Sequence, residues 1–301
     1  AGRTITVRGR FVYERLDAQT VGAFGVTAHV FDDDGLFDQE LATTTTGADG
    51  SFEVDFYWQS QIGDDQPDLR VEFWSENDRV KVRDDWLGGV TPPSKWTSTI
   101  RNDYTGTLLD LGTTRPSNDD DMPVLHILTN LTRTWSYIDT YAGRDVPLVT
   151  AIYPTEQWPA YNPFFHDLYI PRDYDQDPDP DAELLVDFQW RDATHVHEYG
   201  HHVINTLGQT VTPDYCNGNC DEELEGWPWE IDCGHCLTCS ETDHDAWSEG
   251  WPNWLADLLT RRFETLYGLA SLNARPQEDP FDCLDSAGDA CDCNVFTTEG
   301  F

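Results

Sequence analysis

The stretch His197-Glu198-Tyr199-Gly200-His201 decides how the C-terminal half of this 301-residue chain is expected to fold. On a helix, His197 and His201 share one face because they stand four residues apart. This spacing lets two imidazole nitrogens reach one zinc ion, each at about 2.0–2.1 Å. Glu198 then lies beside the metal without ligating it, where a general base is needed to take a proton from water. The sequence therefore predicts a hydrolytic zinc site; the alternative is a pair of helix-surface histidines with no metal.

The residues around the motif predict a helix across residues 182–207. Gly200 is the only Gly or Pro in this range, and apolar residues recur there at helical spacing. A glycine inside a helix costs about 1 kcal/mol relative to alanine, so Gly200 indicates a close approach by another backbone. His195 and His202 neighbour the pair but lie on other faces of the helix. We expect these two histidines to pack in the interior or to hydrogen-bond around the site.

A catalytic zinc usually has three protein ligands and one open position, so a third ligand is needed. Ile204 and Leu207 stand where a metzincin would carry Gly and His, which excludes that class. Glu249 is the best candidate because it begins an amphipathic segment with apolar residues at helical spacing: Trp251, Trp254, Leu255, Leu258, Leu259 and Phe263. One turn beyond Glu249, Asn253 could hydrogen-bond the outer nitrogen of a ligating histidine and fix its tautomer.

The H-E-x-x-H motif followed by a glutamate on a later helix resembles the gluzincin metallopeptidases, the thermolysin-like branch of the zincins. The matching positions are His197, Glu198, His201 and Glu249. Thermolysin-like members commonly carry an aspartate four residues after the third ligand, where this chain has Asn253. The motif together with Trp-Ser-Glu-Gly-Trp at 247–251 is also similar to secreted bacterial proteins of this clan. The resemblance covers roughly the last 180 residues and implies a peptidase that holds Zn²⁺ through the two histidines and Glu249.

A peptidase of this kind also needs a hydrogen-bond donor for the developing oxyanion and a strand that holds the substrate backbone. Tyr215, His235 and His244 are candidate donors by type and position, and His244 is preferred because it lies near the start of the Glu249 helix. Residues 147–153 and 165–170 are predicted strands, and residues 122–141 a predicted amphipathic helix. The resemblance assigns the substrate-binding edge strand to residues 164–170; the alternative is an ordinary core strand.

The N-terminal part shows strand periodicity instead. Apolar residues alternate in four runs: Ile5, Val7, Phe11 and Tyr13; Val26, Ala28 and Val30; Phe52, Val54 and Phe56; Leu69, Val71 and Phe73. Asp49-Gly50 is a tight-turn signal between two of these runs. The pattern predicts a β-sandwich and resembles the transthyretin-like or carboxypeptidase-regulatory-like fold. The predicted fold is therefore α+β, with a β-sandwich at 1–113, a linker at 114–123 and a zincin-like catalytic domain at 124–301.

Charge and hydropathy limit the partners. The formal net charge is −38, with 56 acidic and 18 basic residues. Such a charge disfavours binding to nucleic acid and to anionic membranes, and it suits a saline habitat. No apolar run reaches membrane-spanning length, so we expect a soluble protein. Oligomeric state stays open.

The eight cysteines all follow the metal motif. An even number in a loop-rich region predicts disulfides, an oxidising compartment and hence a secreted protein. The alternative is a second, structural zinc held by Cys233, Cys236 and Cys239, with His235 or Cys216 as a further ligand. In either case the cysteines would hold an insertion at residues 210–243 near the active site. Alternating acidic residues offer oxygen ligands for Ca²⁺, with a solvated helix-capping run as the alternative: Asp175, Asp177, Asp179 and Asp181.

Together these features predict a secreted zinc metallopeptidase that acts on a peptide or protein substrate, with Glu198 as general base. Two alternatives belong to other classes. One is a binding or adhesive protein with a structural metal site, which the presence of Glu198 argues against. The other is a zinc hydrolase of non-peptide amides or esters, which residues alone do not separate from a peptidase.

Overall fold

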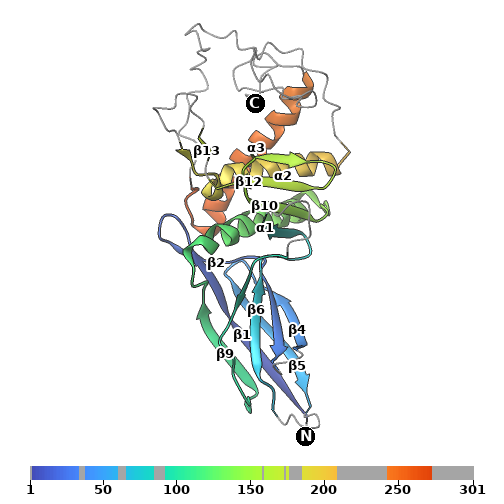
Figure 1. Ribbon diagram of the computed structural model, residues 1–301. Coiled ribbons are helices and arrows are strands. Elements are labelled where there is room, and N and C mark those ends of the chain that lie inside the picture. Colours follow the sequence, from blue (N-terminus) through green and yellow to red (C-terminus); the bar gives the residue numbers. More distant parts are fainter. Residues whose placement is uncertain are drawn as a thin grey trace. The chain divides into compact units, whose positions relative to one another are not determined.

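The computed structural model describes residues 2–33, 38–59, 66–84, 92–157, 159–172, 174–175, 185–208 and 243–272. These residues form an α+β fold, as predicted (Figure 1). The chain divides into two compact units, Ala1–Trp190 and Arg191–Phe301. None of the helices in the described ranges is long and apolar enough to cross a membrane.

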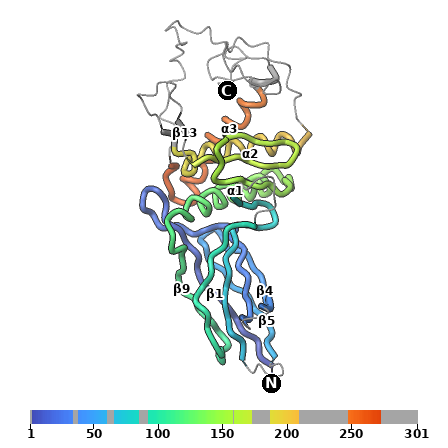
Figure 2. Tube along the Cα trace, viewed as in Figure 1, coloured from blue at the N-terminus to red at the C-terminus, as the bar shows by residue number. Residues whose placement is uncertain are grey.

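Two four-stranded sheets make up most of the first unit (Figures 1 and 2). In one sheet, β1 (Arg3–Glu14) pairs antiparallel with β2 (Thr20–Gly22) and β5 (Ser51–Trp58), and parallel with β9 (Leu108–Thr114). The other sheet is antiparallel throughout, in the order β4 (Gln39–Thr45), β3 (Thr27–Asp32), β6 (Leu69–Trp74) and β8 (Lys95–Thr97).

The alternating apolar residues of these strands point into a shared core. Phe11 of β1 stacks on Phe73 of β6 with ring centroids 4.2 Å apart, which joins the two sheets face to face. Most of the predicted inward residues are buried, among them Ile5, Val7, Ala28, Val30, Leu69 and Val71 at 0% exposure. The predicted turn at Asp49-Gly50 is confirmed, with Gly50 at φ +81°; it connects strands of different sheets. Burial of these side chains is the main stabilising term for this core.

Helix α1 (Met122–Ala142) follows a short 3-10 turn, η1 (Asp119–Asp121), and confirms the helix predicted at residues 122–141. Polar contacts tie α1 to the two sheets' connecting loops. The Phe24 amide donates to Thr129 Oγ1 at 3.1 Å, and Asn77 Nδ2 donates to Thr132 Oγ1 at 3.1 Å. Because buried polar groups need partners, these bonds fix the helix against the loops.

A third sheet has the order β11 (Ala160–Asn162), β12 (Asp167–Pro171), β10 (Val149–Thr155) and β7 (Val80–Arg83). Both strands predicted at 147–153 and 165–170 are present as β10 and β12. The edge-strand assignment for residues 164–170 is wrong, because β12 is paired on both sides and β11 lies at the edge. Strand β7 precedes the predicted linker in sequence, so this sheet joins strands from both sides of residues 114–123.

The predicted helix over 182–207 begins later than expected. Leu185 and Val186 form a short strand, β14 (Leu185–Val186), that pairs with β13 (Tyr174–Asp175), and η2 (Phe188–Trp190) follows. Helix α2 (Asp192–Thr206) starts only there, because the apolar pair at 185–186 is used in strand pairing. The second unit consists of α2 and α3 (Asp243–Tyr267) within the described residues.

Several predicted features lie outside the described residues. They are the eight cysteines, Tyr215, His235, most of the insertion at 210–243, and Asp177, Asp179 and Asp181.

Candidate metal centre

Helix α2 places the two motif histidines on a partly exposed face. Its opposite side is buried, with Val196 and Tyr199 at 0% exposure and Val203 at 2%. Asp192 lies in the first turn, where a carboxylate interacts favourably with the helix dipole. The helix ends before Gly208, which adopts φ +68° and donates its amide to Asn205 O at 3.2 Å. A glycine in this left-handed conformation commonly terminates a helix.

Helix α3 packs against α2 through an apolar stripe that includes Leu255, Ala256, Leu259 and Phe263, each at most 7% exposed. The helix begins at Asp243, upstream of Glu249, so the prediction that the amphipathic segment starts at Glu249 is corrected.

The two helix backbones approach closely at Gly200. A Cβ atom added there would lie 2.9 Å from both Cα and Cβ of Pro252. The expected close approach at Gly200 is therefore confirmed. Sequence patterns did not identify its partner, because no periodicity links residue 200 to residue 252.

The side chains of His197, His201 and Glu249 converge. Glu249 Oε2 lies 3.2 Å from Nε2 of each histidine, and the two Nε2 atoms are 3.0 Å apart. Three ligands of a tetrahedral zinc at about 2.0–2.1 Å stand about 3.3 Å from one another. The three donor atoms match this spacing within a few tenths of an ångström, and imidazole nitrogen and carboxylate oxygen are donors that zinc binds.

Asn253 supports this cluster from the next turn of α3. Its Oδ1 atom lies 2.9 Å from His197 Nδ1, the contact predicted from the sequence. An amide oxygen accepts, so Nδ1 of His197 donates its hydrogen and Nε2 keeps its lone pair for the cluster. Groups of this type fix the tautomer and ring orientation of a metal-binding histidine.

Electrostatics favour an ionised Glu249. Burial alone would raise the pKa of this carboxyl, but electrostatic interaction with His201 and His197 outweighs burial and holds the pKa well below its usual range. The carboxylate is therefore a charged donor group at the junction of α2 and α3. A cation is the chemical partner that such a group favours.

The other predicted site residues lie close to this cluster in sequence. Glu198 follows His197 on α2 and is 5% exposed. His195 and His202 are fully buried, and the His202 ring packs edge-on against Tyr199 with centroids 5.5 Å apart. His244 lies in the first turn of α3; its side chain is outside the described residues. The described residues thus bring together both histidines, Glu249 and Asn253.

Comparison with known proteins assigns no family. No family model matches the chain, and no curated protein matches it. Among solved structures, a 9R-lipoxygenase from Cyanothece PCC8801 is similar over 69% of this chain, with 16% identity and a TM-score of 0.29. The chain spans only 25% of that lipoxygenase. The plantain pollen allergen Pla l 1 (13% identity, TM-score 0.24) is similar over 39% of this chain and 97% of its own length. The shaft pilin SpaA from Lactobacillus rhamnosus GG (11% identity, TM-score 0.22) is similar over 40% of this chain and 50% of its own length.

Proposed function

We propose that this protein is a zinc-dependent metallohydrolase that cleaves peptide bonds. One observation carries the proposal: His197, His201 and Glu249 present three donor atoms, from two helices, at 3.0–3.2 Å from one another. A neutral amide, Asn253, orients one of the donors. Three protein donors would hold a zinc ion and leave one position for a water molecule or a substrate oxygen, as catalytic rather than structural zinc sites do.

In this proposal His197, His201 and Glu249 hold the zinc ion. A bound zinc ion supplies Lewis acidity and lowers the pKa of water towards about 7. Glu198 accepts the proton from the attacking water at its carboxylate and later delivers that proton to the leaving amine. The position of Glu198, next to His197 on α2 and 5% exposed, supports this role. His244 remains the proposed donor to the oxyanion.

The finer architecture belongs to the same proposal. The two facing sheets of the first unit are proposed to form a transthyretin-like or regulatory-like β-sandwich, and α2 and α3 to be the metal helices of a zincin-like domain. The eight cysteines and the net charge of −38 support a secreted enzyme stabilised by disulfides. Calcium at Asp175 and its acidic neighbours is a further proposed ligand.

The first test measures metal binding and cleavage separately. Zinc affinity would be determined by competition with a chromophoric chelator for the wild type, His201→Ala and Glu198→Ala. We expect a stoichiometric site that is lost in His201→Ala and retained in Glu198→Ala, because Glu198 is a base and not a ligand. A wild type that binds no zinc would overturn the proposal.

The second test digests a diverse unstructured peptide library with the zinc-loaded proteins and identifies products by mass spectrometry. We expect the wild type to cleave, with the rate falling by about 10³-fold or more in Glu198→Ala. Zinc binding without peptide cleavage would exclude the peptidase, and ester and amide substrates would then test the non-peptide hydrolase. Four protein ligands in the X-ray absorption spectrum, with no cleavage, would identify a structural metal site.

A further inference from the structure

The N-terminal sheets carry a surface hollow of about 660 Å³. Its lining residues come from β4, β5, β1 and β9. All four strands belong to the first unit and are labelled in Figure 1. Residues that line it include Arg8, Arg10, Ser51, Glu53 and Thr113. The volume falls within the range of small-molecule sites, and the hollow is shallow and open to solvent. The hollow is built from residues far from the metal centre in sequence, and the catalytic proposal does not use it.

Two glycines shape the hollow. The register of β1 against β9 shifts between Arg8 and Arg10, so a bulge interrupts the parallel pairing. The extra residue is in β9, so Gly9 lies opposite the bulge, and a Cβ added at Gly9 would be 3.1 Å from Gly112 O and from the Phe52 ring. Gly112 itself adopts φ +63°. Arg8 and Arg10 stand two residues apart on β1 and therefore project on the same, solvent side of the strand.

The two arginines differ in their partners. Arg8 makes a two-pronged ion pair with Asp110, Nη2 to Oδ2 at 2.9 Å and Nε to Oδ2 at 3.0 Å. Arg10 donates from Nε to the backbone oxygen of Asp49 at 2.7 Å. Within the described part of the chain, its Nη atoms have no hydrogen bond and no ion pair, and the Asp49 carboxylate interacts with Arg10 only at longer range. In a chain with 56 acidic and 18 basic residues, an arginine without a directly bonded carboxylate is unexpected.

The turn at Asp49 holds Arg10 in place over the hollow. Asp49 Oδ1 accepts from the Ser51 amide at 2.9 Å and from the Ser51 hydroxyl at 2.6 Å. These hydrogen bonds lower the pKa of the Asp49 carboxyl, so the carboxylate is stabilised by Ser51. The Asp49 backbone oxygen is thereby fixed and anchors Nε of Arg10, while the rest of the guanidinium fork remains available for a planar anion.

An acceptor lies near this donor. Glu53 faces Arg8 across the β1–β5 pair, and Ser51 faces Arg10, so Arg10 and Glu53 are diagonal neighbours. Diagonal pairs on a sheet stand about 7–8 Å apart. Hydroxyl groups line the same hollow at Thr44, Thr45, Ser51 and Thr113. A ligand with one carboxylate for Arg10 and hydroxyl groups for Glu53 and the threonines satisfies both ends of the site.

We propose that this hollow binds an acidic saccharide of the uronate type. The carboxylate of the sugar pairs with the Arg10 fork, and ring hydroxyls donate to Glu53 and exchange hydrogen bonds with the threonine and serine hydroxyls. A polyanion such as a nucleic acid is disfavoured because Glu53 and Asp110 flank the same surface.

The test uses isothermal titration calorimetry of the full chain with the monosaccharide galacturonic acid, which carries one carboxylate, and with its methyl ester. The ester keeps the shape and removes the charge. We expect the acid to bind and the ester to bind about tenfold more weakly or worse, because a charge-assisted bidentate pair is lost. Arg10→Gln should weaken binding of the acid by about the same factor, and Glu53→Gln by several-fold.

The matched control is Arg115→Gln. Arg115 is an exposed arginine of the same unit and pairs with Glu14 at 3.3 Å, away from the hollow, so its replacement should leave the affinity unchanged. Thermal unfolding of each variant would show that the sheets stay folded. Inorganic sulfate would be titrated as a control anion. Three results would each overturn the proposal: no heat of binding at ligand concentrations up to about 10 mM, equal affinity of the wild type and Arg10→Gln for the acid, or equal affinity of the wild type for the acid and for sulfate.

Discussion

Gly200 of α2 lies directly against Pro252 of α3, at the level where His197, His201 and Glu249 converge. The Pro252 backbone occupies the space that a side chain at position 200 would need. His201 is the next residue on α2, and Asn253 the next on α3. The separation of the two helix backbones therefore controls the distance between the histidines and Glu249.

Replacing Gly200 by alanine should separate the helices. The added Cβ would clash with Pro252 at 2.9 Å, and this overpacking should outweigh the better helix propensity of alanine. We expect the free energy of unfolding to fall by about 1–2 kcal/mol and zinc affinity to fall with it. Urea unfolding and chelator competition would measure the two effects. Asp257→Ala, which removes an exposed ion pair on α3, is the control and should change neither by much. A Gly200→Ala protein that is more stable than the wild type would contradict the close packing.

Asn253→Ala should weaken zinc binding without unfolding the protein. The substitution removes the acceptor for His197 Nδ1, so the ring is free to rotate and to change tautomer. We expect zinc affinity to fall about 10–100-fold. Asn253→Asp restores an acceptor and should bind zinc at least as well as the wild type. If Asn253→Ala bound zinc like the wild type, Asn253 would have no orienting role.

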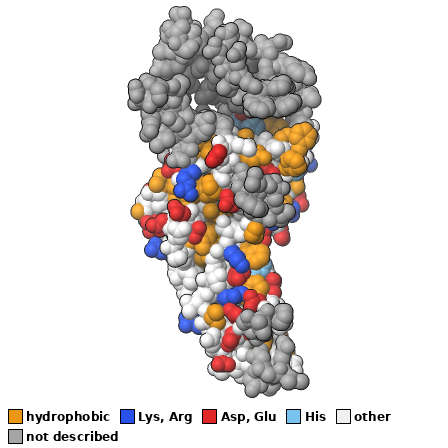
Figure 3. Space-filling model, viewed as in Figure 1, with side chains coloured by type: hydrophobic (Ala, Val, Ile, Leu, Met, Phe, Trp, Pro, Cys, Tyr) orange, Lys and Arg blue, Asp and Glu red, His pale blue; other side chains and the backbone are white. Residues whose placement is uncertain are grey.

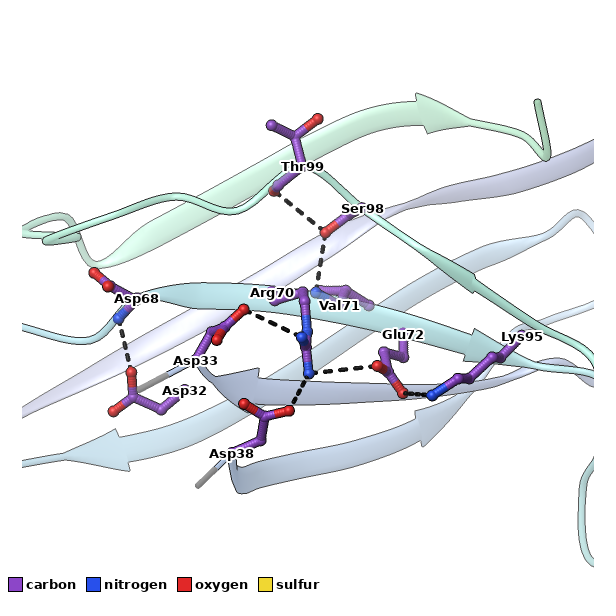
Figure 4. A network of polar contacts seen from close by, with 10 residues as sticks. All are labelled: Asp32, Asp33, Asp38, Asp68, Arg70, Val71, Glu72, Lys95, Ser98 and Thr99. Atoms are coloured by element: carbon purple, nitrogen blue, oxygen red, sulfur yellow. Dashed lines mark hydrogen bonds and ion pairs between the residues drawn. The ribbon is translucent and has the colours of Figure 1, made fainter. Parts of the chain in front are cut away.

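A network of ion pairs connects β6 to the end of β3 and to the start of β4 (Figure 4). Arg70 is its centre, with Nη1 at 3.1 Å from Asp33, Nη2 at 2.7 Å from Asp38, and Nη2 at 3.4 Å from Glu72. The guanidinium also lies over the Phe31 ring, 5.4 Å from its centroid. The Arg70 side chain is only 15% exposed, so screening by water is incomplete.

Arg70→Ala should therefore destabilise the first unit by about 2–3 kcal/mol, because three carboxylates lose their shared counter-charge. Part of the loss should be recovered in about 0.5 M salt, which screens the remaining repulsion. Arg8→Ala removes an ion pair whose partners are both 47% exposed and should cost about 1 kcal/mol or less. Urea unfolding at two salt concentrations distinguishes the variants; equal losses for both would mean that the network contributes no more than a surface pair.

The buried phenol of Tyr153 should make the free energy of unfolding depend on pH. Burial raises the pKa of this phenol to about 12, although Arg172 opposes the shift. The unfolded chain ionises the same group near pH 10. Because the folded pKa is the higher one, the stabilising contribution of the neutral phenol is present below about pH 10 and is lost as the pH rises towards about 12.

The difference between wild type and Tyr153→Phe isolates this effect. The free energy of unfolding should fall between about pH 8 and pH 11.5 by more in the wild type than in the variant. Tyr57→Phe is the control because Tyr57 is 66% exposed, and its pH profile should match that of the wild type. Parallel profiles for wild type and Tyr153→Phe would show that burial of this phenol does not affect stability.

Local periodicity was enough to predict much of the fold. The alternation of Ile5, Val7 and Phe11 predicted β1, and the pattern over residues 122–141 predicted α1. Pairing between distant segments could not be predicted, because periodicity describes one strand at a time. The interior position of β12 and the use of Leu185–Val186 as a strand both depend on such pairing, and both departed from expectation.

The candidate site, like the fold, could be predicted from the sequence only in part. The placement of His197 and His201 on one helix face was predicted from their four-residue spacing, because this placement depends on one helix only. Glu249 and Asn253 were inferred from chemistry and spacing on a second helix, and the structure brings Glu249 to 3.2 Å from both histidines. The role of Pro252 and the arginine-lined hollow depend on contacts between separate elements, which sequence patterns do not encode.

Strand β7 has a consequence for dissecting this protein. A fragment that stopped at Thr114 would keep β7 but lose its parallel partner β10, exposing the bare hydrogen-bonding edge of residues Val80–Arg83. A complementary fragment beginning after Thr114 would carry β10 with an open edge of its own. Unpaired edges recruit strands from other chains. Each of the two fragments should therefore self-associate when expressed alone. When mixed, they should re-form a soluble heterodimer through the pairing of β7 with β10.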